Sequence, residues 1–154
     1  MRKPFVNLKF NPRCPLPLRP ALSLYHAHRF AEAISYLEDL KKGRRISDGI
    51  FYVMMTFATG GAALPFFPWA MKDTYDPLFR LLTNCYFQLG NDEAAVRCFG
   101  KIFDKTAIDW AIASLSLEAL GQTDRATVAR QRAVRADPML GDWLGKGGSG
   151  SAQA

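Results

Sequence analysis

The 154-residue sequence contains few of the residues on which disulfide frameworks and metal sites depend. It has three cysteines, Cys14, Cys85 and Cys98, and two histidines. No two cysteines have the Cys-x-x-Cys spacing, and an odd number of unpaired cysteines is typical of a reducing compartment. The cysteine content therefore predicts a cytoplasmic protein.

No set of residues has the spacing of a catalytic or metal site. His26 and His28 stand two residues apart, so on a helix they point to different sides and suit shared metal ligation poorly. Cys85 and Cys98 lie in apolar stripes, where an inert buried thiol is the default. The glycine-rich stretches lack the Lys-Ser/Thr of a phosphate loop. We expect no catalytic residue, no cofactor and no metal, and therefore no enzyme.

Acidic residues are missing from the start of the chain, where the first is Glu32. Residues 1–19 are basic and proline-rich, without the apolar run of a secretory signal, and we expect them to precede the folded domain. The whole chain carries 20 Lys and Arg against 14 Asp and Glu, a net charge of +6. The basic clusters are small, and we interpret them as solvated faces rather than a nucleic-acid surface. The alternative is an RNA-contacting helical repeat that uses Arg125, Arg130, Arg132 and Arg135.

Residues 50–71 form a run of 22 residues without a charge. The run is long enough to cross a bilayer. However, Gly60, Gly61, Pro65 and Pro68 interrupt it, and prolines would break a spanning helix near one end. We interpret the run as a buried pair of helices. The alternative is a membrane-associated assembly factor inserted through residues 50–71.

The chain has a period of about 31 residues. Gly60, Gly90 and Gly121 stand 30 and 31 residues apart, and each separates two apolar segments of helical length. A second series at 62 and 31 residues is formed by Ala33, Ala95 and Ala126. Self-similarity at such a period is typical of stacked helical repeats.

The clearest unit begins at Phe79. Phe79, Leu82 and Tyr86 have the i, i+3, i+7 spacing of one helical face. Gly90 can end this helix in a left-handed conformation, and Asn91 can cap the next one. The sequence therefore predicts a helical hairpin.

The following unit repeats this plan, with an aromatic at Trp110, a turn at Gly121, a predicted cap at Thr123 and an end at Asp137-Pro138. Two earlier hairpins are predicted as well. The first turns at His28-Arg29, and the second comprises residues 50–59 and 64–72 and ends at Asp76-Pro77.

These units resemble the tetratricopeptide repeat, whose pattern is an aromatic, a Leu and small pair, an aromatic, then Ala, an aromatic, Ala and Pro. The departures are Thr83 and Ser114 in place of Gly, Arg130 in place of an aromatic, and Ala107 in place of a closing Pro. The resemblance implies an all-α fold, a right-handed stack of about three to four antiparallel hairpins. It covers roughly residues 20–138. We expect the helical domain to comprise residues 20–144, followed by a flexible Gly/Ser tail at residues 145–154.

Such stacks bind partners on a concave surface lined by the first helix of each hairpin. The predicted groove is apolar, with one basic and one amide group, and suits a hydrophobic peptide or helix. Its candidate residues are Tyr25, Met54, Phe57, Arg80, Asn84, Phe87, Leu115 and Glu118.

Arg80 and Asn84 resemble half of the basic clamp with which chaperone-docking tetratricopeptide proteins hold a carboxylate, although Ile112 replaces the second Asn. A small tetratricopeptide-like protein with an apolar groove resembles the small chaperones of type III secretion, so we expect an adaptor or chaperone. Its partner would be another protein, and the sequence leaves homo-oligomerisation open.

Overall fold

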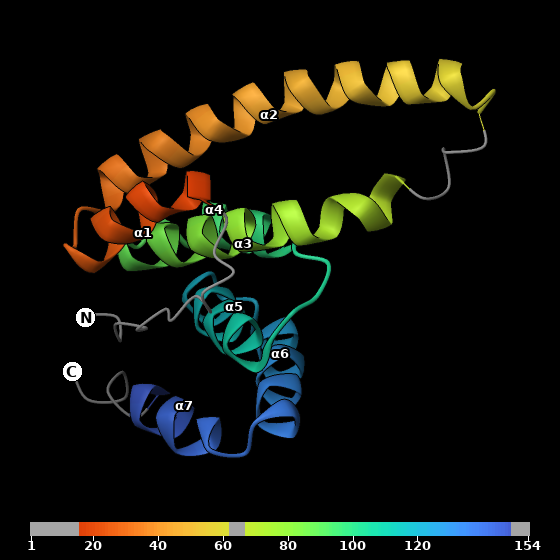
Figure 1. The fold of residues 1–154 in the computed structure, drawn as a ribbon. Coiled ribbons are helices and arrows are strands. Elements are labelled where there is room, and N and C mark those ends of the chain that lie inside the picture. The colour runs from red at the N-terminus through yellow and green to blue at the C-terminus, as the bar shows by residue number, and fades with distance from the viewer. Residues whose placement is uncertain (1–15, 62–66, 149–154) are drawn as a thin grey trace.

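The computed structural model describes residues 16–61 and 67–148. Within these ranges the chain forms eight helices and no strand (Figure 1). The predicted all-α class is confirmed. The predicted N-terminal segment lies mostly outside the described residues, because only Leu16–Leu18, a 3-10 helix, and Arg19 belong to them.

The first hairpin joins α1 (Arg19–His26) to α2 (Phe30–Ala58). Pro20 lies in the first turn of α1, where its missing N–H would have no helical partner in any case. His28 takes the left-handed conformation, with φ 59°, and reverses the chain. The predicted turn at His28-Arg29 is confirmed.

Helix α2 is a single helix of 29 residues, about 44 Å long at 1.5 Å per residue. Two helices were predicted in this segment, one of the first hairpin and one of the second, and that division is wrong. Gly43 and Gly49 both lie inside this helix near the expected boundary, and each helical glycine costs only about 1 kcal/mol. The helix ends instead at Gly60 and Gly61, which have φ values of 58° and 93°.

Helix α3 (Phe67–Gln88) is also continuous, with Pro77 inside it. The predicted end of the second hairpin at Asp76-Pro77 is therefore wrong. A proline removes one backbone hydrogen bond, and the packing of the following residues holds the helix together across that gap. The predicted second hairpin thus consists of the distal halves of α2 and α3 and is not a separate unit.

The two later hairpins follow the prediction closely. After α3, Gly90 has φ 78°, and the Asn91 side chain accepts a hydrogen bond from the backbone N–H of Ala94 (3.2 Å) to cap α4 (Asp92–Phe99). Gly121 has φ 73° between α5 (Ala107–Ala119) and α6 (Thr123–Ala136). Thr123 is the first residue of α6 rather than its cap, so that detail of the prediction is wrong.

Helix α7 (Leu140–Gly148) covers the end of the last hairpin. Leu144 is buried against Ala111 and Ala133, with Leu140 and Trp143 beside it. The flexible tail was predicted to begin at residue 145, which lies inside α7, so that boundary is wrong. Residues 149–154 of the predicted tail lie outside the described residues.

Each helix packs mainly against its neighbours in the sequence, from α1 and α2 through α3 and α4 to α5, α6 and α7. The largest core cluster lies where α1, α2, α3, α4 and α5 meet, and α5 contributes the buried Ile112 and Ala113 to it. The distal half of α2 extends beyond α1 and α4 (Figure 1). We call residues 50–58, the last nine residues of α2, the distal arm.

Candidate functional site

Three of the eight predicted groove residues belong to the interior. Tyr25, Asn84 and Phe87 are each 0% exposed. The side-chain amide of Asn84 donates to the carbonyl oxygen of Arg80 at 2.8 Å. Because these three side chains have no accessible surface, they cannot line a groove, and their inclusion in the predicted site is corrected here.

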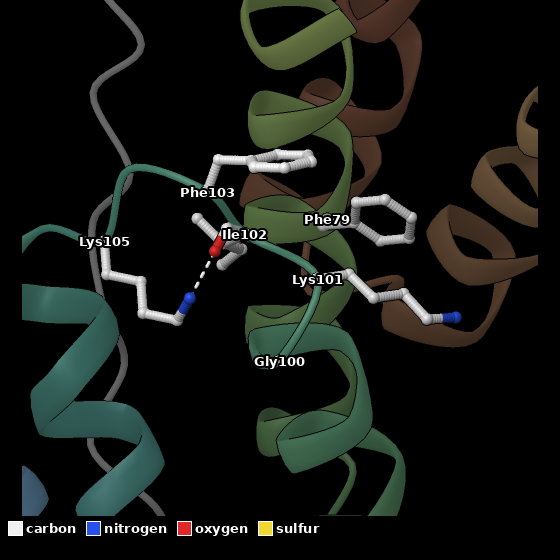
Figure 2. A pocket seen from close by; sticks show the side chains of 6 residues that line it. All are labelled: Phe79, Gly100, Lys101, Ile102, Phe103 and Lys105. Carbon is white, nitrogen blue, oxygen red and sulfur yellow. Dashed lines mark hydrogen bonds between the residues drawn. The ribbon is translucent and has the colours of Figure 1, made fainter. Parts of the chain in front are cut away.

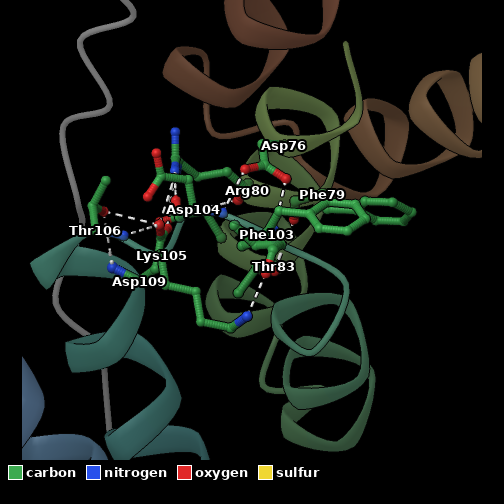
Figure 3. Close-up of polar contacts among 11 residues, drawn as sticks. Asp76, Phe79, Arg80, Thr83, Phe103, Asp104, Lys105, Thr106 and Asp109 are labelled. Carbon is green, nitrogen blue, oxygen red and sulfur yellow. Dashed lines mark hydrogen bonds and ion pairs between the residues drawn. The ribbon is translucent and has the colours of Figure 1, made fainter. Parts of the chain in front are cut away.

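Arg80 is engaged by the protein itself. Its Nε donates to both carboxylate oxygens of Asp109, at 2.9 and 3.1 Å, and its Nη2 donates to the carbonyl oxygen of Asp104 at 2.9 Å. Figure 3 shows this guanidinium between α3 and the start of α5. The carboxylate that faces Arg80 therefore belongs to the protein itself, which leaves this half of the clamp pattern occupied by Asp109.

The same junction contains four further hydrogen bonds to carboxylates, two to Asp109 and two to Asp76 (Figure 3). Asp109 accepts hydrogen bonds from the backbone N–H and the hydroxyl of Thr106, at 2.8 and 2.9 Å, and so completes a capping box at the start of α5. Asp76 accepts from the backbone N–H groups of Phe103 and Asp104, both at 2.8 Å. These contacts fix the α4–α5 connection against α3, so we assign them a structural role.

Two more predicted groove residues lie on α5. Leu115 is half-buried and packs on the core. Glu118 is exposed and forms an ion pair of 2.9 Å with Arg130 of α6. The structure therefore brings neither of them to an open surface shared with the residues on α2.

Met54 and Phe57 of the distal arm are exposed, at 66% and 83% of their surfaces. They do not stand alone, because six of the eight residues from Ile50 to Phe57 are large hydrophobic side chains with substantial exposure. The other four are Ile50, Phe51, Val53 and Met55. The apolar run was predicted to be a buried pair of helices, and the exposure of these six side chains shows that this is wrong for residues 50–57.

The distal arm reverses the usual amphipathic arrangement. Along the first half of α2 the outward face carries Glu32 and Asp39, as expected for a solvated helix face. Val53 and Phe57 follow Asp39 by 14 and 18 residues, about four and five helical turns, so they stand on the same face. The half-buried positions of the arm include Thr56, whose hydroxyl donates to the carbonyl of Tyr52 at 2.8 Å. The arm therefore turns its most apolar side chains toward solvent.

An open hollow of about 480 Å³ lies beside the α4–α5 connection (Figure 2). It contains Lys101 and Lys105 among aromatic side chains, but both ammonium groups have internal partners. Lys101 lies over the ring of Phe79 at 5.5 Å, and Lys105 lies over Phe99 at 5.2 Å and donates to the carbonyl of Ile102. No acid–base pair lines the hollow, so we assign it no chemistry.

The described cysteines are not activated. Burial raises the pKa of the Cys85 thiol to about 12 and raises that of Cys98 as well. A thiol is nucleophilic only as the thiolate, which a raised pKa suppresses. Among the described residues no cluster of three or more His, Cys, Asp or Glu side chains is arranged to hold a metal ion.

None of the helices in the described part of the chain combines the length and the apolarity that crossing a membrane requires. Comparison with models of protein families, with curated proteins and with solved structures finds no match for this chain. The exposed residues themselves are therefore the basis for assigning a function.

Proposed function

We propose that the protein is a non-catalytic protein-interaction module, an adaptor or chaperone, whose docking surface is the distal arm of α2. The observation that carries this proposal is the set of six exposed large hydrophobic side chains between Ile50 and Phe57. Single exposed hydrophobic residues are ordinary, but contiguous apolar patches on a protein surface mark interaction sites.

The arm replaces the predicted concave groove as the binding surface. The succession of the α3–α4 and α5–α6 hairpins, with glycine turns at Gly90 and Gly121, supports a tetratricopeptide-like stack as the body of the module. In this proposal the body holds α2 in place and the arm meets the partner. The low cysteine content favours the cytoplasm as the compartment.

A protein partner suits the arm better than a lipid surface. Helices that lie on membranes are rich in Lys and Arg on their polar face. No charged residue occurs anywhere in residues 49–71, and the half-buried positions of the arm include Tyr52 and Thr56. The arm therefore has the apolar half of a membrane-surface helix without its basic half.

Affinity capture from a detergent-free lysate tests the proposal, with Met54→Glu/Phe57→Glu compared with the wild type. The matched control is Met139→Glu/Phe103→Glu, which makes the same two changes at side chains that are 78% and 60% exposed on other elements. We expect the arm variant to lose bound protein while the control retains it, with helical circular dichroism preserved in both. Equal capture by both variants would show that the arm is not the docking surface.

A further inference from the structure

We infer that the distal arm pairs with the distal arm of a second copy of this chain, as an antiparallel two-helix contact. This inference rests on the proposed function, because it names the partner of the same surface. It follows from the spacing of the exposed side chains, from the charges that flank them and from the area that they leave open.

The spacing of the exposed residues fits a second helix. Ile50, Val53 and Phe57 stand at i, i+3 and i+7, the a, d, a positions of a heptad. All three are more than half exposed on the outward side of α2. A strip of this kind presents knobs that fit between the side chains of a facing helix, whereas an extended peptide would leave the strip partly uncovered.

The absence of charge fits a second copy. In helix pairs, charged residues beside the apolar strip determine which partner is accepted. Residues 49–71 contain no charge, and the strip is flanked by Met54 and Thr56. Two identical arms can therefore approach without repulsion at the contact itself.

The charges at the base of the arm favour the antiparallel direction. Lys42 is exposed and Arg44 half-buried, both shortly before the arm. In a parallel pair, Lys42 of each copy would lie beside its own equivalent. In an antiparallel pair with the two-fold axis between residues 51 and 52, Ile50 lies against Val53 of the second copy. Arg44 then lies beside Thr59 of the second copy, the C-cap of its α2, where the partial negative charge of a helix end attracts a cation.

The exposed area supplies about half of such a contact. Phe57 is 83% exposed and Met54 66%, and an aromatic side chain has a surface of about 150–250 Å². By the same proportion the four side chains on this side of the arm, Ile50, Val53, Met54 and Phe57, leave on the order of 450 Å² open. A standard specific interface removes about 800 Å² from each partner, so the strip supplies about half of one interface.

Light scattering on the purified full-length chain across a concentration series tests the pairing. We expect a mass twice the 17.2 kDa of one chain, reduced to one chain by Phe57→Glu and unchanged by the control Phe103→Glu. A wild-type mass of one chain at every concentration overturns the inference, including the case in which that monomer sediments with phosphatidylserine vesicles. A Phe57→Glu protein that remains a dimer overturns it as well.

A spin label at position 39 tests the direction without disturbing the contact, because Asp39 is exposed and lies outside the arm. In an Asp39→Cys/Cys14→Ser protein, an antiparallel pair separates the two labels by 25 residues of helix, about 38 Å. A parallel pair brings them to about 10 Å, the spacing of packed helices, and that result overturns the direction. If the two labels show no dipolar coupling at all, the pairing itself is overturned.

The two proposals fail separately. If the chain is a monomer but captures another protein in a manner that depends on Met54 and Phe57, the second-copy inference is wrong and the proposed function stands. If neither self-association nor capture depends on these residues, both are wrong.

Discussion

Replacing Asp109 with alanine is expected to destabilise the fold more than any surface substitution. The Asp109 side chain is 0% exposed and pairs with Arg80, whose side chain is 21% exposed. Removing one partner of a buried ion pair costs about 3–5 kcal/mol, because the remaining charge is left without compensation. Arg80 retains some contact with water and its bond to the carbonyl of Asp104, which reduces this cost. The loss of the capping box with Thr106 adds about 1 kcal/mol.

We therefore expect Asp109→Ala to lower the free energy of unfolding by about 3–4 kcal/mol, and the melting temperature by about 10 °C. Urea unfolding followed by circular dichroism at equilibrium measures the first quantity. The control is Arg80→Met/Asp109→Leu, which removes both charges and should recover a large part of the loss, since no unpaired charge remains. A loss below about 1 kcal/mol in Asp109→Ala, or no recovery in the double variant, would refute the account of this junction.

Two glycines should respond in opposite directions to alanine. Gly43→Ala, inside α2 with nothing within 4 Å of the added methyl group, should raise the free energy of unfolding by about 0.5–1 kcal/mol. Gly90→Ala, at φ 78°, should lower the free energy of unfolding by about 1–2 kcal/mol. Urea titrations in which both substitutions change this free energy in the same direction would contradict the prediction. The Cys85 thiol should make stability fall with alkaline pH, because its pKa is raised from 9.0 to about 12 in the folded state. The raised pKa of this thiol contributes at most about 4 kcal/mol to the free energy of unfolding. That contribution is complete below pH 9 and is lost as the pH rises toward 12. Unfolding free energies measured from about pH 8 to 11 should therefore decline less steeply in Cys85→Ala than in the wild type, and equal slopes would contradict the assignment.

The local signals in the sequence predicted the later hairpins well. Gly90 and Gly121 adopt the left-handed conformation that a helix end requires, and Asn91 caps α4 as expected. These features depend on a few neighbouring residues, so a single sequence is enough to find them.

The continuity of α2 and α3 was not predicted, because the signals at their centres are weak. Gly43 weakens a helix without ending it, and Pro77 removes one hydrogen bond from a helix that packing holds on its C-terminal side. The assumption of a regular repeat placed boundaries where the chain has none. As a result, Met54 and Phe57 were assigned to a groove and lie on an exposed arm instead.

The pairing of Arg80 with Asp109 could not be read from the sequence, because 29 residues separate them and the contact depends on how α3 meets α5. One local signal was present. Thr106 and Asp109 have the spacing of a capping box, and an acid directly before the apolar residues Trp110, Ala111 and Ile112 indicates a carboxylate with an internal partner.

Hydrogen exchange in the distal arm tests most directly whether its outward face is a docking surface. The backbone amides of residues 50–58 should exchange more slowly as the concentration of the wild-type chain rises, while those of residues 78–88 in the core stay unchanged. Phe57→Glu should remove the concentration dependence. Exchange in the arm that is the same at every concentration, and the same with a captured partner bound, would contradict the assignment of this surface.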